Sequence, residues 1–219
     1  MSAAEVYRSA ALPGPDTPWR QVPYCVVDLE TTGLDPHRDE IISYAAVPID
    51  EGRVVLGDVA QALVRPEGRI GRDSVPIHGI RPHDVAGSPP LEEVLDGLLE
   101  AMSGRVLVVH VDWVERGFLG SALRRRQLRL REPVLDTARL AAARLPGVPD
   151  PVSLTWLARH LGLPVYGQHE ALGDAITTAQ VFLALVTRAE RVCPQTLGTL
   201  SAQAARTRRR GRLARMLRL

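Results

Sequence analysis

The sequence of 219 residues has no lysine, few aromatic residues and only two cysteines. Aromatic side chains make up 4% of the chain, so a core must be built mainly from Leu, Val, Ile and Ala. Cys25 and Cys193 are far apart in the sequence, which argues against a disulfide framework. No apolar run approaches the roughly 20 residues that span a bilayer, and residues 1–19 lack the apolar stretch of a secretory signal. These absences predict a cytoplasmic protein without an integral membrane span.

The positive charge, which comes entirely from Arg, is unevenly distributed. Residues 201–219 contain seven Arg and no acidic residue, so this segment carries +7 and the first 200 residues carry −5. A basic tail on a mildly acidic body indicates an anionic partner for the tail. A solvated, disordered end explains the same composition equally well. Residues 124–131 hold five more Arg, which either form a solvated surface or contact nucleic acid.

The hydrophobic pattern predicts an α/β fold in one domain. Residues 1–20 are rich in Ala, Pro and Gly and are expected to form an N-terminal extension, and residues 193–219 form the basic C-terminal tail, which can be helical. Between them, three strands in sequence are followed by alternating helices and strands, which predicts a mixed sheet flanked by helices. Strands are expected at 24–30, 40–50, 53–66, 105–110 and 133–136, with a turn at Glu51-Gly52; helices are expected at 90–102, 114–128, 137–145, 153–163 and 169–192.

Two carboxylates end the first predicted strand. Asp28 and Glu30 are two residues apart, so their side chains project from the same face. Neighbouring carboxylates repel unless they share a proton or a cation, and oxygen ligands of this kind suit Mg²⁺ or Mn²⁺. Two solvated acids at a strand end would look the same, so this pair alone does not identify a site.

A second candidate pair lies at the start of the last long helix. His169 and Asp174 are five residues apart, and both can face one cleft. Aspartate is also favoured near a helix N-terminus by the helix dipole, and His169 can be an ordinary loop histidine. The pair therefore gains weight only together with Asp28 and Glu30.

Three segments carry a resemblance to a known family. They read CVVDLETTGLDP at residues 25–36, LVVHVDWVERGFL at 107–119 and HEALGDA at 169–175. In this order and spacing they resemble the three motifs of the DEDDh 3′–5′ exonucleases, the family of the proofreading subunit of bacterial DNA polymerase III, ribonuclease T and oligoribonuclease. IHGI, VLDTARLA and SLTWLARHLGL resemble further segments of the polymerase-associated branch. The resemblance implies a ribonuclease H-like fold and an exonuclease domain over residues 21–192.

The middle motif departs from the family pattern, which typically reads His-Asn-x-x-Phe-Asp-x-x-Phe-Leu. Aligning His110 and Phe118 places Glu115 at the position of the family's aspartate. Glutamate keeps the carboxylate but extends it by one methylene. Asp112 is a rival ligand, although Asp112 and Glu115 also have the spacing of a helix capping box. We assign Glu115 to the metal site and Asp112 to capping.

The resemblance implies a role for each site residue. Two divalent ions, Mg²⁺ or Mn²⁺, would be bridged by Asp28, while Glu30 and Asp174 would hold the ion that activates water. Glu115 would support the second ion. His169 would act as the general base, a role that suits the ordinary pKa of histidine near 6.5.

The resemblance also implies which residues bind the substrate. Thr31, Thr32 and Leu34 match the positions that meet the terminal 3′-hydroxyl and pack against the terminal base. Gly33 between them would allow close approach of the backbone. His78 either lines the nucleotide pocket or orders its own loop.

Three functions are compatible with these residues. The first is a 3′–5′ exonuclease acting on single-stranded 3′ ends, with DNA as the expected substrate, either alone or as the proofreading partner of a DNA polymerase subunit. The second is an RNA-trimming or short-oligonucleotide exonuclease of the same family, because the motifs contact backbone and terminus rather than base sequence. The third is a nucleic-acid-binding module whose catalysis is weakened by the glutamate at position 115. The oligomeric state is left open.

Overall fold

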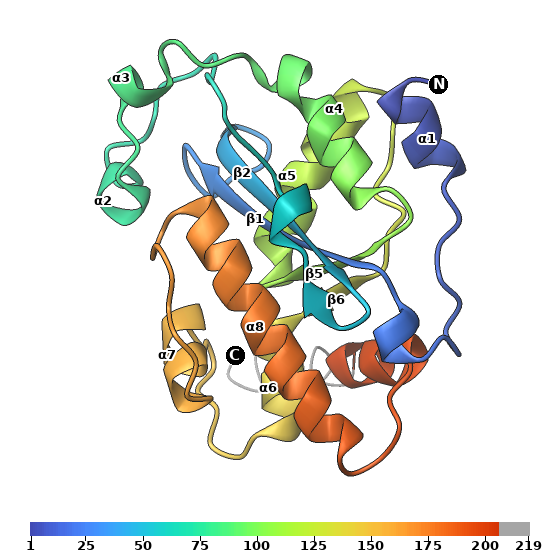
Figure 1. Cartoon of the computed structure of the whole chain (residues 1–219). Coiled ribbons are helices and arrows are strands. Elements are labelled where there is room, and N and C mark those ends of the chain that lie inside the picture. Colours follow the sequence, from blue (N-terminus) through green and yellow to red (C-terminus); the bar gives the residue numbers. More distant parts are fainter. Residues whose placement is uncertain (206–219) are drawn as a thin grey trace, which may run out of the picture.

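The computed structural model of the protein describes residues 1–205 and shows a mixed β-sheet with helices on both faces (Figure 1). The strands run in the order β3-β2-β1-β5-β6, and β4 pairs with β2. β1 pairs antiparallel with β2 and parallel with β5. The predicted α/β architecture is confirmed. The strands are β1 (Tyr24–Thr31), β2 (Ile41–Asp50), β3 (Arg53–Val54), β4 (Ala60–Leu63), β5 (Val106–Val109) and β6 (Val134–Asp136).

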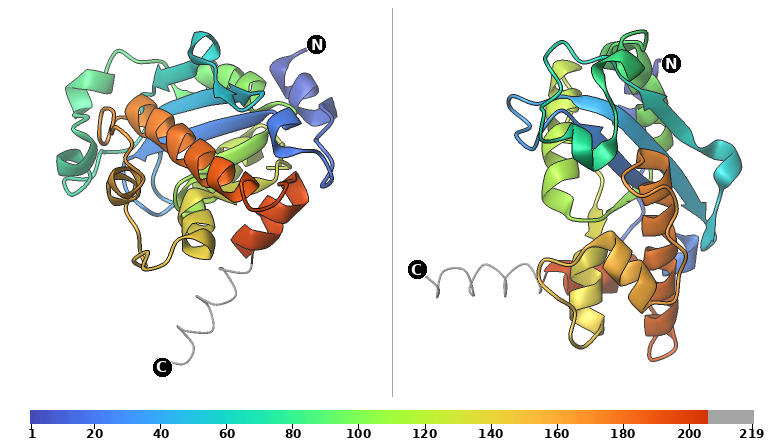
Figure 2. Two further views of the ribbon diagram at one scale, coloured as in Figure 1. Left: turned by 60° about the horizontal axis from the view of Figure 1, so that its bottom comes forward. Right: turned by 90° about the vertical axis from the view of Figure 1, so that its left-hand side faces the viewer.

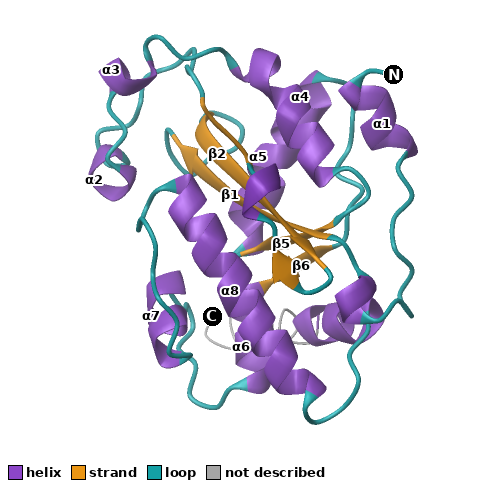
Figure 3. Cartoon of the chain, in the orientation of Figure 1, coloured by secondary structure: helices purple, strands orange, loops and turns teal. Residues whose placement is uncertain are grey.

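Two groups of helices cover the two faces of the sheet (Figures 2 and 3). On one face lie α1 (Ala3–Ser9), α4 (Leu91–Met102) and α5 (Asp112–Arg125). On the other face lie α6 (Thr137–Arg144), α7 (Leu154–His160) and α8 (Ala171–Glu190). α4 and α5 on one face and α8 on the other bury apolar side chains against the sheet, so β1 and β5 are enclosed from both sides. This arrangement explains why both strands read as continuous apolar runs in the sequence.

The alternation of side chains along β1 decides where the acidic pair points. Tyr24 and Val26 belong to the core on the α8 face, whereas Cys25 and Val27 belong to the core on the α4 and α5 face. Because side chains alternate with a period of two, the residues at positions 28 and 30 continue the face of Tyr24 and Val26. The two carboxylates of the strand therefore face α8.

The predicted turn at Glu51-Gly52 joins β2 and β3. Both residues have positive φ, 51° and 72°, which is the backbone of a type I′ hairpin turn. The single strand predicted for residues 53–66 is wrong: it is divided into β3, a 3₁₀ turn at Leu56–Asp58 and β4. Gly57 and Asp58 favour a turn over a strand, which accounts for the interruption. Residues 74–90 contain two short helices, α2 (Val75–His78) and α3 (Pro82–Val85).

The two ends of the described chain pack against the core. Within the expected N-terminal extension, α1 lies against α4, and the side chain of Tyr7 is 1% exposed. The Tyr7 hydroxyl donates a hydrogen bond of 2.5 Å to the Glu132 carboxylate. At the other end, residues 197–205 are helical and bury Leu197 and Leu200. The seven Arg of the basic tail lie at 206–219, outside the described residues. No helix among residues 1–205 is long and apolar enough to cross a membrane.

Candidate active site

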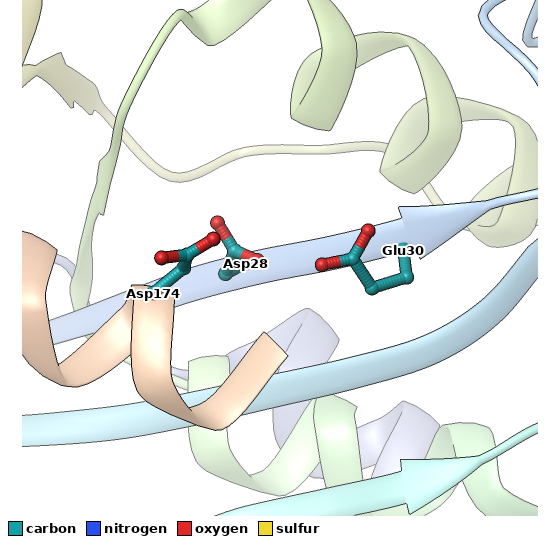
Figure 4. Close-up of side chains that lie close together, drawn as sticks. All are labelled: Asp28, Glu30 and Asp174. Atoms are coloured by element: carbon teal, nitrogen blue, oxygen red, sulfur yellow. The ribbon is translucent and has the colours of Figure 1, made fainter. Parts of the chain in front are cut away.

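Three carboxylates meet at the end of β1. Asp28 and Glu30 come from the strand, and Asp174 comes from the first turn of α8 (Figure 4). One oxygen of each lies within 4.8 Å of the others. The pairing of β1 with β2 shifts register between Glu30 and Thr31, so the regular sheet ends at this point. The fold therefore brings together two groups that the sequence predicted separately: Asp28 and Glu30 on the strand, and Asp174 on the helix.

The electrostatics of this cluster favour a cation. Burial, together with repulsion from Glu115, Glu30 and Asp174, raises the pKa of Asp28 well above its usual value. Burial and the charge of Asp174 raise the pKa of Glu30 to about 8. Burial also raises the pKa of Asp174. A divalent ion would remove this repulsion, and clustered carboxylate oxygens are the donor set that Mg²⁺ and Mn²⁺ prefer. The cluster can hold such an ion.

Glu115 supplies a fourth carboxylate next to this cluster. Its side chain is only 5% exposed, and burial raises its pKa well above the usual range. Its charge acts on Asp28, and that of Glu30 acts on it, so the three lie within electrostatic reach. The Oε2 atom of Glu115 is buried without a hydrogen-bond partner among the described residues. A buried carboxylate oxygen in this state needs a cation, a proton or water. Its role as a metal ligand stays a prediction.

His169 lies at the rim of the site, just before α8. Its backbone is left-handed, with φ of 62°, and its N–H donates a hydrogen bond of 3.0 Å to Asp174 Oδ2. Gly173 allows this arrangement, because a Cβ there would lie 2.5 Å from the carbonyl oxygen of Gly167. The backbone of the loop therefore packs on the first turn of α8, while the imidazole is exposed. An exposed ring beside the carboxylates can reach a water molecule at a bound phosphate.

The loop after β1 is held by its own hydrogen bonds. Thr31 Oγ1 donates to the Gly33 carbonyl at 2.6 Å, and Thr32 Oγ1 donates to Asp39 Oδ1 at 3.2 Å. A Cβ at Gly33 would lie 2.5 Å from the Asp39 carboxylate, so glycine is needed for packing within the loop itself. Leu34 is 65% exposed and is available to a ligand. Contact of these four residues with substrate stays a prediction.

His78 faces a cavity that it shares with His169. The cavity is also lined by Ser43, Gln61 and Leu63. His78 Nδ1 accepts a hydrogen bond of 3.0 Å from the Ile80 N–H, whereas Nε2 is buried without a hydrogen-bond partner in the described chain. The histidine therefore orders its own loop and also borders the cavity. Both readings of His78 given by the sequence are compatible with this geometry.

Comparison with known proteins assigns the chain to a family. The profile of the RNase T exonuclease family matches residues 25–182. The chain belongs to this exonuclease family. It is 32% identical over 164 residues to the DNA polymerase III subunit epsilon of Aquifex aeolicus, a match that covers 74% of this chain and 80% of the relative. The exonuclease family expected from the three motifs is thereby confirmed, whereas the place of Glu115 in the second motif stays a prediction.

Other relatives in the family are much longer than this chain. A DNA polymerase III subunit epsilon-like protein of Rhodobacter capsulatus is 37% identical over 91% of this chain, which spans 28% of that relative. A PolC-type DNA polymerase III of Thermotoga petrophila is 34% identical over 81% of this chain, which spans 13% of that relative. The match in each case is confined to a part of the relative.

Solved exonuclease structures have the same fold. Exonuclease X, in complex with 5′ overhanging duplex DNA, superposes with a TM-score of 0.67 at 23% identity, covering 83% of this chain and 99% of that one. Escherichia coli exonuclease I, in complex with a dT13 oligonucleotide, superposes with a TM-score of 0.67 at 18% identity. The superposition covers 78% of this chain and 42% of the exonuclease I chain. The expected ribonuclease H-like fold is confirmed by these likenesses.

Asp112, the rival carboxylate of the second exonuclease motif, does not cap α5. The N-cap is Val111, and no side chain of the capping residue accepts a hydrogen bond. Asp112 is instead the first residue of the helix, and its buried carboxylate is paired with the guanidinium groups of Arg139 and Arg116. The capping prediction for Asp112 is wrong because two arginines provide charged partners, and such bonds are stronger than a neutral backbone N–H can offer.

Asp136, which was not singled out in the sequence, does the capping instead. Its carboxylate accepts hydrogen bonds from the backbone N–H groups of Val111 and Asp112 at the start of α5. It also accepts from the N–H groups of Ala138 and Arg139 at the start of α6. One side chain therefore fixes the beginnings of two helices, and one of these carries Glu115. The only signal in the sequence was its place in VLDTARLA, a segment that resembles the polymerase-associated branch.

Alanine at position 136 is expected to lower the free energy of unfolding by about 3 kcal/mol, because buried N–H groups at both helix starts lose their acceptor. Asparagine keeps one acceptor oxygen and should lose about half as much. Urea unfolding of the two variants and of wild type measures both effects. Equal urea midpoints for Asp136→Ala and wild type would rule out the double cap.

The basic run at residues 124–131 contacts the protein itself. Arg125 pairs with Glu92 at 3.2 Å, and Arg126 pairs with Asp96 at 3.2 Å. Arg131 donates to backbone carbonyls of the N-terminal segment, including that of Tyr7 at 3.0 Å. These three arginines therefore join α5 and its following loop to α4 and to the segment around α1.

Proposed function

We propose that this chain is a metal-dependent 3′–5′ exonuclease that removes nucleotides from the 3′ ends of single-stranded DNA. The observation that carries the proposal is the cluster of Asp28, Glu30 and Asp174, with the exposed His169 beside it. The raised pKa of these carboxylates shows that the chain alone does not stabilise their charges. A site of this kind is suited to binding a cation and a phosphodiester together.

Asp28, Glu30 and Asp174 would hold the divalent ions, and Glu115 would complete the set. The orphaned Oε2 of Glu115 and the mutual repulsion of the acids fit this assignment. Bound ions of this type neutralise the charge that develops on phosphate and lower the pKa of water. Magnesium and manganese both suit an all-oxygen set of ligands.

His169 would remove the proton from the attacking water. Its ring is exposed at the rim, and its loop is fixed through the backbone bond to Asp174, so the imidazole can turn toward a phosphate without disturbing the carboxylates. Leu34, also exposed at the rim, would pack against the terminal base, and the products would be nucleoside 5′-monophosphates.

Two features of the relatives support DNA as the substrate. The similar proteins from Aquifex aeolicus and Thermotoga petrophila are named as DNA polymerase III components. The two superposed structures contain DNA. By the names of the relatives we also propose a DNA polymerase subunit as a partner for this chain.

Product analysis tests the activity, the polarity and the choice of sugar together. DNA and RNA strands of matched sequence, labelled at the 5′ end, are incubated with Mn²⁺ or Mg²⁺ and with EDTA as the control. Stepwise shortening of DNA from the 3′ end, faster than that of RNA, is the expected result. If RNA is trimmed faster than DNA, the substrate is RNA instead of DNA. Strands that stay intact with both Mn²⁺ and Mg²⁺ would overturn the proposal.

A further inference from the structure

Exposed hydrophobic side chains are concentrated around the acidic cluster. Eight large hydrophobic residues are exposed among residues 1–205, and five of them belong to segments near the end of β1: Leu34, Leu63, Ile77, Trp113 and Tyr166. Single exposed hydrophobic residues are normal on a protein surface. A concentration of them on segments around one site instead marks a place where a ligand binds.

Trp113 is the most distinctive member of this group. It is 53% exposed, whereas Trp19 is 1% exposed and Trp156 is stacked on His160. It stands in the first turn of α5, two residues before Glu115. In the motif that this segment resembles, the aromatic residue comes one position later, where this chain has Val114. The indole is therefore a feature of this chain and does not follow from the family pattern.

The packing of α5 shows which way Trp113 projects. Residues 113 and 117 share one face of the helix because they are four positions apart. Gly117 lies against the loop that follows β1, since a Cβ at this position would be 2.8 Å from Cγ of Pro36. Trp113 therefore extends from the side of α5 that faces the loop carrying Leu34. The exposed indole and the exposed leucine border the same end of β1.

Two cationic side chains accompany the indole. Arg116, three residues further along α5, has a side chain that is 41% exposed, and Asp112 holds it at 3.2 Å. Arg38, in the same loop as Pro36, has a side chain that is 86% exposed and lies 3.8 Å from Asp35 Oδ2, a solvent-exposed pair. An aromatic surface beside guanidinium groups is the combination that binds unpaired nucleic acid, in which bases stack and phosphates are neutralised.

We propose that Trp113 is a stacking surface for an unpaired base of the substrate strand, upstream of the nucleotide that is removed. This inference rests on the proposed function, and it adds a second base-binding position beyond the terminal one. Because a base must be unpaired to lie on the indole, the site selects single strands. A nucleotide ester with one base does not reach Trp113 and is handled by the acidic cluster alone.

Two measurements on the full chain test this stacking site. Binding of a fluorescently labelled strand of about 12 nucleotides is followed by anisotropy in Ca²⁺, and hydrolysis is followed with the same strand and with the p-nitrophenyl ester of thymidine 5′-monophosphate in Mn²⁺. Trp113→Ala should weaken binding of the strand and raise its KM by about tenfold or more, the scale of one stacked base. Hydrolysis of the ester should stay within about twofold of wild type, and Trp113→Phe should restore most of the binding. The control is Leu56→Ala, which removes a side chain that is 60% exposed on the 3₁₀ turn between β3 and β4.

The outcomes separate this proposal from the proposed function. Unchanged strand binding in Trp113→Ala overturns the stacking site, even if wild type trims DNA. A parallel loss of ester hydrolysis also overturns it, because Trp113 would then support the fold of the metal site instead. If wild type hydrolyses neither substrate but its strand binding depends on Trp113, the nuclease proposal fails, and Trp113 stacks a base of a strand that the protein binds without cutting. A strand that does not bind to wild type overturns both.

Discussion

Asparagine at position 28 is expected to abolish trimming of a DNA strand while making the metal-free protein more stable at pH 8. The Asp28 carboxylate is enclosed with three other acids, and burial and their charges raise its pKa. Asparagine has nearly the same shape but carries no charge, so the repulsion disappears and the melting temperature in EDTA should rise. The rate should fall by about a thousandfold or more, since charge neutralisation by bound metal supplies several kcal/mol of transition-state stabilisation.

The opposite signs of these two effects make the experiment decisive. A residue with only a structural role would lose activity and stability together. Asp58→Asn, which changes an exposed acid on the 3₁₀ turn, is the matched control and should alter neither quantity. Thermal melts in EDTA and in Mn²⁺ are compared with initial rates of trimming. Trimming by Asp28→Asn at the wild-type rate would remove Asp28 from the active site.

The parts of the site that could be predicted from the sequence follow from short-range geometry. The spacing of Asp28 and Glu30 fixed their common face as soon as the strand was recognised, and the structure confirms the strand. Asp174 was expected at the start of a helix, where it is found. Hydrophobic periodicity could not predict that β1 and the start of α8 lie next to each other. That expectation came from the resemblance of three ordered motifs, which carries long-range information that a local pattern lacks.

Asp112 and Asp136 show why the remainder could not be predicted. The spacing of Asp112 and Glu115 matches a capping box, which is a local interaction. In the folded chain Asp112 is paired with Arg139, 27 residues away, and Asp136 takes its place at the helix start. Both partners become available only when β5 and β6 pair in parallel and bring the starts of α5 and α6 together. Interactions of charged residues across the sheet override the local pattern.

The burial of residues 1–20 is a second feature that the sequence pattern could not predict. α1 has seven residues, too few to display a helical period, and the segment around it is rich in Ala, Pro and Gly. The burial of α1 depends on Tyr7, whose hydroxyl donates a hydrogen bond to the Glu132 carboxylate. A single long-range hydrogen bond and one buried ring give no repeating signal. The structure therefore assigns to the core a segment that composition alone describes as an extension.

The metal-free protein is expected to lose stability as the pH rises from about 4.5 to about 8, and divalent metal should restore it. Burial and the charge of Asp174 give Glu30 a pKa of about 8 in the folded chain, against 4.5 for an ordinary glutamate side chain. Between these values the folded state binds more protons than the unfolded state, so the free energy of unfolding falls as pH increases. The full shift corresponds to about 5 kcal/mol, lost progressively across this window and not recovered above it.

Metal reverses the trend because only the deprotonated carboxylates bind it. Binding must displace the extra protons, so apparent affinity increases with pH. The rise in Tm on adding Mn²⁺ should therefore be larger at pH 8 than at pH 6. Calorimetric melts at several pH values, in EDTA and in Mn²⁺, measure both dependences on the same protein.

The substitution Glu30→Gln measures how much of the pH dependence of stability comes from the Glu30 carboxylate. Glu30→Gln cannot titrate, so the part of the stability loss that Glu30 contributes between pH 4.5 and pH 8 in EDTA should disappear, together with part of the stabilisation by Mn²⁺. The part that comes from the raised pKa values of Asp28, Glu115 and Asp174 should remain. Glu67→Gln, at an exposed position, should retain the wild-type dependence. If Glu30→Gln and wild type have the same slope of stability against pH, Glu30 is not one of the groups that couple folding to proton binding. Retention of that slope with an unchanged response to Mn²⁺ would also place the metal away from the end of β1.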